Sequence, residues 1–456
     1  MTRSGKLFFF VIALTTTACA GARDATSENP LPASASSTPA AVSSAPPVEA
    51  APTVVPDTKP AGAVASARPV TQSPSASGTV VPAPARPLVA GVHPTPPVLD
   101  SLIRGTLAAR GLYVFRFGAN TRRMKHLIGI ADSTEINALV IDVKDEFGLN
   151  FNSSDPLLQK NGGTQVKSQN LRALVDSLRA HGILPIARIV VFKDSVAARN
   201  NPEHTIRQPD GSAWRDKQGL TWVNPYANEI WEYNLRVGDE AIRMGFGEIQ
   251  FDYIRFPEPY RSLPRQVFPG QNGRSKPEVL AEFLSAARAR YAKAGVRTTA
   301  DVFGLVTTVP GALEIGQAWE PLAKAVDVML PMVYPSHYPR GSFNIDRPNA
   351  APYEIIHAAI SRARERNEKL GLTGEAVRPW LQAFSIGNPK YGPAEIEAQK
   401  QAVYDSGYDG WVMWEPGTRY DIFLPALEKT FISRKKNPPV PRGTRRESST
   451  SQAPPE

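Results

Sequence analysis

The sequence has only one cysteine, Cys19, among 456 residues. A single cysteine forms no disulfide within the chain, so the stability of the folded part must come from a buried core. The six histidines include no closely spaced pair, which leaves the sequence without the ligand patterns of a zinc site. We therefore expect no bound metal.

Two further classes of motif are missing. The sequence contains no Gly-x-Gly-x-x-Gly fingerprint and no Walker-type phosphate loop, so we expect no nucleotide cofactor. It also has no Gly-x-Ser-x-Gly elbow, which argues against a nucleophilic serine. Among the catalytic groups considered, carboxylates therefore remain as candidates.

The apolar run at the N-terminus, Leu7–Leu14, is too short to cross a bilayer, which takes about 20 residues. Basic residues precede it and Ala18-Cys19-Ala20 follows, so residues 1–20 are predicted to be an export signal. The position of Cys19 resembles a bacterial lipobox, in which the thiol carries a lipid that anchors the protein to the membrane. Thr16 replaces the usual leucine of that motif, and a freely secreted protein is the alternative. Both interpretations predict a protein of the periplasm or cell surface.

Positive charge is concentrated near the ends of the chain. The formal net charge is +9, but residues 434–456 hold six basic and two acidic side chains, and residues 1–98 hold six and four. Residues 99–433 therefore carry only +3, and we expect no nucleic acid partner. Residues 21–98 are rich in Ala, Pro, Ser, Thr and Val without periodicity, which predicts a disordered linker, and residues 434–456 form a disordered basic tail.

Residues 99–433 alternate between strand-like and helix-like segments. Apolar residues recur at helical spacing in segments 171–178, 230–237, 279–291 and 355–360. Eight apolar runs predict strands: 111–118, 138–145, 184–192, 248–257, 298–304, 327–334, 378–385 and 410–416. This repeat favours a single (β/α)8 TIM barrel, an α/β fold, over the alternative of an open doubly wound sheet.

Capping residues support the helical segments. Asn224 followed by Pro225 is typical of a helix start, so we expect a helix to begin there. Gly182, Gly245 and Gly295 each follow a periodic segment and precede a predicted strand, which is typical of helix ends.

One predicted strand carries an acid, Asp252, in an otherwise apolar run, where a charge is costly unless it is paired. Alternation along this strand directs Gln250 and Asp252 into the barrel and Ile249, Phe251 and Tyr253 toward the helices. Active sites of TIM barrels lie at the C-terminal ends of the strands, where Asp252 is expected.

Polar residues of other strands are predicted to meet Asp252 at the same end of the barrel. For Asp142 and Lys144 the alternative to a substrate contact is an internal ion pair with each other. Arg188, on the neighbouring strand, is the expected counter-ion of Asp252. The full set of candidate substrate-binding residues at this end is Asp142, Lys144, Arg188, Arg255, Tyr334, His337 and Gln382.

Asp252 and Asp301 lie on neighbouring predicted strands, and two carboxyl groups at that spacing have different pKa values. Glycoside hydrolysis uses such a pair, with one carboxyl as acid and the other as nucleophile or base. Asp252 is the candidate nucleophile or base and Asp301 its candidate partner. Glu415, at the end of the eighth strand, and Asp142 compete for the partner's role.

The longest loop, 193–223, follows the third predicted strand and contains Trp214 and Trp222. Long loops commonly bind substrate, and exposed indoles offer flat faces for sugar rings. Both tryptophans are therefore candidate substrate-binding residues, with packing inside the loop as the alternative.

These segments also carry a resemblance, which spans most of residues 110–430. The sequence resembles a bacterial family of glycoside-hydrolase-like TIM barrels once known only as a domain of unknown function. The resemblance rests on Glu248-Ile-Gln-Phe-Asp-Tyr-Ile-Arg-Phe-Pro257, Val140-Ile-Asp-Val-Lys-Asp145, Ala300-Asp-Val-Phe-Gly304, Pro331-Met-Val-Tyr-Pro-Ser-His337 and Gly410-Trp-Val-Met-Trp414.

The resemblance implies a TIM-barrel hydrolase that acts on a cell-envelope or extracellular polysaccharide. It carries the acidic residue at the end of the fourth strand of such barrels onto Asp252, and the aspartate of the family's Ala-Asp-Val-Phe-Gly stretch onto Asp301. Glu415 departs from the asparagine expected after Trp414, which weakens the case for Glu415. A barrel that binds glycan without cleaving it is one alternative function, and a polysaccharide deacetylase or lyase is another.

Overall fold

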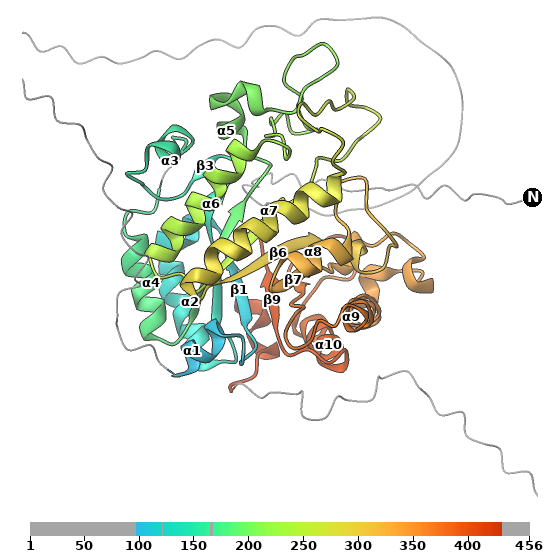
Figure 1. The fold of residues 1–456 in the computed structure, drawn as a ribbon. Helices are drawn as coiled ribbons and strands as arrows, with labels where there is room; N and C mark the ends of the chain where they lie inside the picture. The colour runs from blue at the N-terminus through green and yellow to red at the C-terminus, as the bar shows by residue number, and fades with distance from the viewer. Residues whose placement is uncertain (1–96, 121, 165–166, 431–456) are drawn as a thin grey trace, which may run out of the picture. The chain divides into compact units, whose positions relative to one another are not determined.

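The computed structural model describes residues 97–430 except 121 and 165–166, and these residues belong to one compact unit (Figure 1). The predicted export signal with Cys19, the linker up to residue 96 and the basic tail 434–456 lie outside the described residues. Helix α1 (Pro97–Ile103) begins just before the predicted domain start. None of the described helices combines the length and apolar character that a membrane span requires.

Eight parallel strands close into a barrel. They are hydrogen-bonded in the order β1-β9-β8-β7-β6-β5-β4-β2, and β1 also pairs with β2. Each overlaps one of the eight predicted segments: β1 (Arg110–Val114), β2 (Ala138–Asp145), β4 (Leu184–Val190), β5 (Glu248–Asp252), β6 (Arg297–Phe303), β7 (Val328–Met332), β8 (Trp380–Gln382) and β9 (Trp411–Trp414). The predicted TIM barrel is confirmed, and the open sheet is wrong.

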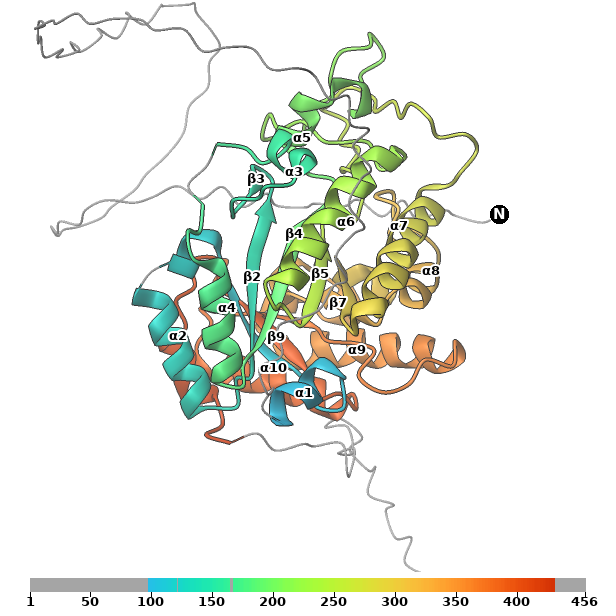
Figure 2. The same ribbon diagram turned by 60° about the vertical axis from the view of Figure 1, so that its left-hand side comes forward.

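A ninth strand, β3 (Gly148–Leu149), was not predicted. It pairs antiparallel with the end of β2, so that Asp145 lies opposite Gly148. Residues 146 and 147 form the turn of this short hairpin. The hairpin lies at the C-terminal end of the barrel (Figure 2).

Helices surround the barrel, and Figure 2 shows α4 and α6 alongside β2 and β4. The longer helices are α2 (Arg122–Ser133), α4 (Leu171–Ala180), α6 (Asn228–Arg243), α7 (Lys276–Tyr291), α9 (Pro352–Lys369) and α10 (Pro393–Asp405). Shorter ones are α3 (Pro156–Lys160), α5 (Ser195–Asn200) and α8 (Trp319–Ala325). Short 3-10 helices are η1 (Arg116–Asn120), η2 (Pro202–His204), η3 (Ala292–Ala294), η4 (Gly304–Thr307), η5 (Pro335–His337), η6 (Ser342–Asn344), η7 (Pro348–Ala350) and η8 (Asp421–Ala426).

Two predicted helix ends follow local sequence signals, and one predicted helix start does not. Gly245 and Gly295 have φ angles of 97° and 68°, which glycine adopts most readily, and each follows a helix as predicted. The predicted helix start at Asn224 is wrong, because α6 begins at Asn228. The Asn224 side chain instead accepts the backbone N–H of Tyr226 at 3.2 Å in a turn that precedes the helix.

Side chains alternate between two apolar clusters, as the sequence predicts. On β2, Leu139, Ile141 and Val143 belong to the cluster that packs against the helices. Ala138 and Val140 belong to the cluster inside the barrel. This alternation directs the polar residues of the strands inward, where they need partners.

Polar layers fill the interior below the C-terminal ends of the strands. At the N-terminal end, the Glu248 carboxylate is paired with Arg378 at 2.7 Å and with Arg297 at 2.8 Å. In the next layer, Trp380 Nε1 donates to Asp301 Oδ1 at 2.7 Å. The barrel is therefore closed from below, and its open end is the C-terminal one.

Candidate active site

Asp252 is the last residue of β5 and lies at the C-terminal mouth of the barrel. Its Oδ2 atom accepts a hydrogen bond from Arg188 Nη2, and its Oδ1 atom accepts the backbone N–H of Tyr253 at 2.5 Å. The residue is 7% exposed. The predicted counter-ion role of Arg188 is confirmed.

Arg188 joins three acids. Besides Asp252, it donates from Nη1 to Asp142 Oδ1, and its Nε atom lies 3.8 Å from Asp301 Oδ2. Burial disfavours the charged guanidinium, but Asp142 and Asp252 outweigh this effect and raise the pKa of Arg188 well above its usual value. A permanent positive charge therefore bridges two carboxylates at the mouth.

Lys144 does not share this site, and the predicted ion pair between Asp142 and Lys144 is wrong. The register of β2 against β4 shifts between these two residues, which is the mark of a bulge. The Lys144 ammonium lies 2.8 Å from Asp194 Oδ2, and both residues are fully buried. Lys144 therefore holds α5 against the barrel and has no access to substrate.

Asp142 is held by two donors, Arg188 and the Tyr113 hydroxyl, whose oxygen is 2.5 Å from Asp142 Oδ2. Burial raises the pKa of Asp142 to about 6, although Arg188 and Tyr113 counteract the shift. Tyr113 was not predicted as a site residue, because its contact with Asp142 depends on how the neighbouring strands β1 and β2 pair.

The raised pKa of Asp142 predicts a pH-dependent stability. Since the folded state holds this proton more tightly than the unfolded one, its stabilisation is complete below about pH 4 and is lost as the pH rises through about 6. A shift of this size corresponds to about 3 kcal/mol. Asp142→Asn should flatten the curve of unfolding free energy against pH between about pH 4 and 6, measured by urea titration at each pH. Equal slopes in the wild type and the variant would contradict the raised pKa of Asp142.

Asp301 lies one layer below Asp252 and is 1% exposed. Both its oxygens accept from Gln250 Nε2 at 3.0 Å, and Oδ1 also accepts from Trp380. Burial, followed by the negative charge of Asp252, raises the pKa of Asp301 well above its usual value. The structure thus places Asp301 next to Asp252 as predicted, but beneath the surface of the mouth.

Glu415 turns away from this group. Trp414, which precedes it, faces the barrel interior and stacks on Tyr334 with ring centroids 5.4 Å apart. The Glu415 carboxylate instead accepts the backbone N–H of Arg419 at 2.6 Å and so closes its own loop. The expectation that Glu415 converges with Asp252 is wrong, because Trp414 occupies the inward position.

Gln382 and Arg255 are engaged by the protein. Gln382 is fully buried, and its Oε1 atom accepts the backbone N–H of Ser336 at 3.0 Å. It therefore joins β8 to the loop after β7, which contradicts a substrate contact. Arg255 is paired with Glu258 at 3.0 Å, and its guanidinium lies 5.1 Å from the Trp222 ring.

The prediction that Trp214 and Trp222 expose their indole faces is wrong, since each is 1% exposed. Trp214 Nε1 donates to the backbone carbonyl of Pro264 at 2.9 Å, and Trp222 Nε1 donates to Asp216 at 3.0 Å. The two indoles form the core of the long loop. They stabilise the loop that lies above β4 and β5.

A different set of rings borders the mouth. Tyr334, His337, Phe384 and Trp414 contact one another with ring centroids 5.1–5.9 Å apart. His337 keeps an exposed edge, and desolvation lowers its pKa to about 4, so the ring is neutral at pH 7. Tyr334 and His337 were predicted here, whereas Phe384 and Trp414 were missed. Continuing the period-two alternation to the end of β9 and two residues past β8 would have identified both.

Backbone strain marks the residue after Asp252. Tyr253 has a φ angle of 50°, a left-handed conformation that costs a tyrosine roughly 1–3 kcal/mol. The Tyr253 ring packs edge-on against Trp222 at 5.7 Å. Such strain is concentrated at functional sites, where it fixes the direction of a side chain.

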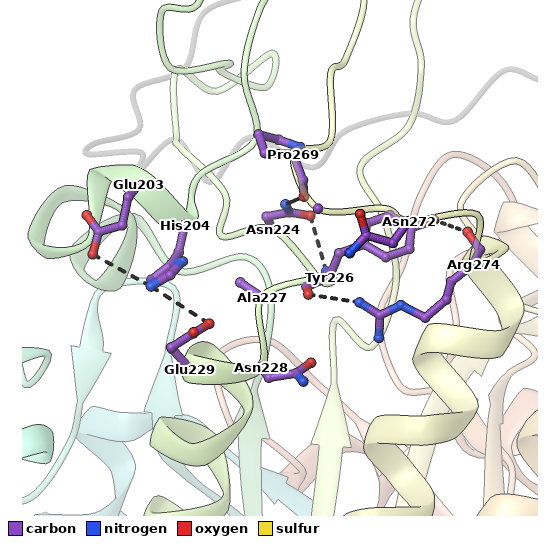
Figure 3. Close-up of a pocket in the computed structure, with 11 residues that line it drawn as sticks. Glu203, His204, Asn224, Tyr226, Ala227, Asn228, Glu229, Pro269, Asn272 and Arg274 are labelled. Atoms are coloured by element: carbon purple, nitrogen blue, oxygen red, sulfur yellow. Dashed lines mark hydrogen bonds and ion pairs between the residues drawn. The ribbon is translucent and has the colours of Figure 1, made fainter.

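A cavity of about 330 Å³ lies apart from these residues, at the start of α6 (Figure 3). Figure 3 shows His204 between Glu203 and Glu229, with its Nε2 atom 3.6 Å and 3.9 Å from their carboxylates. Arg274 closes the other side by donating to the Tyr226 carbonyl at 3.1 Å. Neither this cavity nor a second one of about 300 Å³ is lined by Asp142, Arg188 or Asp252.

Carboxylates at the C-terminal end of a TIM barrel are the arrangement that barrel glycosidases use. The chain belongs to the family described as Putative glycosyl hydrolase domain, whose model matches residues 111–420. The family and the fold together assign the protein to the glycosidases. None of the curated proteins matches the chain.

Solved structures resemble the chain to different extents. A hypothetical protein from Ruminiclostridium thermocellum is 35% identical over 42% of this chain and 97% of its own, with a TM-score of 0.39. The glycoside hydrolase domain of PgaB (BpsB) from Bordetella bronchiseptica is 14% identical over 71% and 99%, with a TM-score of 0.53. The glycoside hydrolase domain of PelA from Pseudomonas aeruginosa is 11% identical over 68% and 96%, with a TM-score of 0.40. The PgaB domain supports the barrel fold.

Proposed function

We propose that the protein hydrolyses a cell-envelope or extracellular polysaccharide, with Asp252 as the nucleophile or general base. The main support for this proposal is the position of Asp252, which ends β5 and forms an ion pair with Arg188. The predicted export signal supports a substrate outside the cytoplasm.

The mouth supplies what glycoside hydrolysis needs from a carboxylate. A carboxylate attacks the anomeric carbon or removes a proton from the attacking water. Arg188 holds Asp252 in one orientation, and the Tyr253 N–H fixes its second oxygen. Asp301 adds a second carboxyl beside Asp252, and burial followed by the charge of Asp252 raises the pKa of this carboxyl well above its usual value.

The aromatic rings supply the face on which a sugar ring can rest. Tyr334 and Trp414 stack at an interplanar angle of 28°, and Trp414 is partly exposed. Phe384 supports both rings from the side. These residues lie across the barrel from Asp142 and Asp252, so a sugar between the two sides would contact both.

Trp414→Ala should raise KM about tenfold with a smaller change in kcat. Removing the indole deletes apolar contact with the sugar in both the ground state and the transition state, and about 1.4 kcal/mol of binding energy corresponds to that factor. Initial rates of reducing-end release over a range of polysaccharide concentrations measure both constants. A loss of kcat alone would contradict a binding role.

One observation favours a second candidate, a barrel that binds glycan without cleaving it. Both oxygens of Asp252 already have partners, and the residue is 7% exposed. In this case Asp252 and Arg188 would bind sugar hydroxyls. The predicted export signal fits this candidate equally well.

A hydrolase produces new reducing ends, whereas a barrel that only binds glycan does not. The purified protein is incubated with exopolysaccharide and cell-wall glycan preparations, and new reducing ends are measured together with retention of the glycan by the protein. The hydrolase predicts reducing ends that increase with time. Retention of glycan without any new reducing end would overturn the hydrolase and support the binding barrel.

A further inference from the structure

Four carboxyl groups at or near the mouth are already engaged. Asp142 and Asp252 bind Arg188 with one oxygen and a further donor with the other. Asp301 is enclosed by Gln250 and Trp380, and Glu415 binds its own loop. Glycoside hydrolysis also needs an acid that reaches the oxygen of the departing sugar. An acid outside this set would reach that oxygen without giving up an existing contact.

The position of Glu146 makes it a candidate for this acid. It follows β2 directly and occupies the turn of the β2–β3 hairpin, four residues after Asp142. Ser195 binds its carbonyl oxygen through the backbone N–H at 3.1 Å and through Oγ at 2.9 Å, so its backbone is fixed. Its side chain is half-buried and makes no hydrogen bond or ion pair among the described residues. Both carboxylate oxygens are thus available to a ligand.

The negative charge of Glu146 acts on the Asp142 side of the Arg188 bridge. Burial above all raises the pKa of Tyr113, and the charge of Glu146 adds to that shift. The Tyr113 hydroxyl is the group that binds Asp142. The Glu146 carboxylate, in the turn that follows β2, therefore lies near the Asp142 half of the site.

The neighbour of Glu146 in the turn is an exposed aromatic residue. Phe147 is 41% exposed, and among the described residues only two other large hydrophobic side chains, Val98 and Ile422, are comparably exposed. Its N–H donates to Asp145 Oδ1 at 2.9 Å, which holds the turn in place. The Arg116 guanidinium lies over one face of the ring, 5.5 Å from its centroid. The exposed part of the ring, beside a free carboxyl, is suited to contact the sugar that departs.

We propose that Glu146 is the general acid of this site and that Phe147 contacts the departing sugar. This proposal rests on the proposed hydrolase function. The Glu146 carboxyl gives its proton to the glycosidic oxygen as the bond from that oxygen to the anomeric carbon breaks, so the sugar leaves as an alcohol. Water supplies the hydroxyl that ends on the anomeric carbon. Its proton passes to Asp252 if Asp252 is the base, or to Glu146 if Asp252 is first the nucleophile.

The test is Glu146→Gln in the full chain, assayed on the exopolysaccharide and cell-wall glycan preparations that the wild-type protein cleaves. We expect kcat to fall about 10²–10⁴-fold. Glu397→Gln, which removes an exposed carboxylate on α10, is the matched control and should keep wild-type kinetics.

The melting temperature of Glu146→Gln should equal that of the wild type, since no partner of the side chain is lost. If the wild type cleaves these glycans and Asp252→Asn does not, while Glu146→Gln keeps the wild-type rate, the assignment of Glu146 is overturned and the hydrolase stands. If the wild type cleaves none of them, the hydrolase and the assignment fall together.

Discussion

Asp252→Asn is expected to lower the rate of polysaccharide hydrolysis by about 10²–10⁴-fold. The amide has the shape of the carboxylate, but it neither attacks an anomeric carbon nor accepts a proton from water at neutral pH. Its oxygen can still accept the N–H of Tyr253, which now binds Asp252 Oδ1 at 2.5 Å. The backbone strain at Tyr253 and the direction of the side chain should therefore persist. The rate of reducing-end release at saturating glycan measures the effect.

Asp176→Asn is the matched control for this variant, because Asp176 forms an exposed ion pair with Arg172 on α4, outside the barrel. Exposed pairs of this kind contribute less than about 1 kcal/mol, so activity and stability should change little. Affinity for the glycan should survive in Asp252→Asn, since Arg188 and the aromatic rings are unchanged. A variant that retains more than a tenth of the wild-type rate would show that Asp252 is not the catalytic carboxylate.

Arg188→Leu should have the largest effect on stability. The substitution leaves Asp142 and Asp252 buried without their shared counter-ion, and breaking a buried pair in this way costs about 3–5 kcal/mol. The loss should shrink as the pH falls, because protonated carboxyls no longer need the charge. Urea unfolding at pH 7 and at pH 4.5 measures both effects.

The triple variant Arg188→Leu, Asp142→Asn and Asp252→Asn separates loss of charge balance from loss of packing. It should recover part of the stability, since no uncompensated charge remains. Arg172→Leu, on the surface of α4, serves as the control for removing an arginine. A destabilisation below about 1 kcal/mol for Arg188→Leu would mean that the mouth is far more hydrated than its burial indicates.

The barrel and the inward position of Asp252 were predictable because both follow from period-two alternation, which is a local property of the chain. Pairing of Arg188 with Asp252 was predictable too, since neighbouring parallel strands bring their inward residues together. Sequence alone could not show that Arg188 also binds Asp142, because that contact depends on the register of a third strand.

The errors come from features that are not local. A bulge in β2 moves Lys144 away from Asp142 and toward Asp194. No residue type in the strand predicts this bulge. Trp214 is buried by Pro264, which lies 50 residues further along the chain. The error at Glu415 was avoidable, because strict alternation already assigns the inward position to Trp414.

Hydrolysis in water enriched with ¹⁸O tests the central claim most directly. If the protein is a glycoside hydrolase that depends on Asp252, mass spectrometry of the wild-type products will show one ¹⁸O atom on each new reducing end, and Asp252→Asn will yield almost no product. Shortened chains with an unsaturated end and no label would show a lyase, and chains of full length that have lost acetate would show a deacetylase. Either result would contradict hydrolysis of the glycosidic bond at this site.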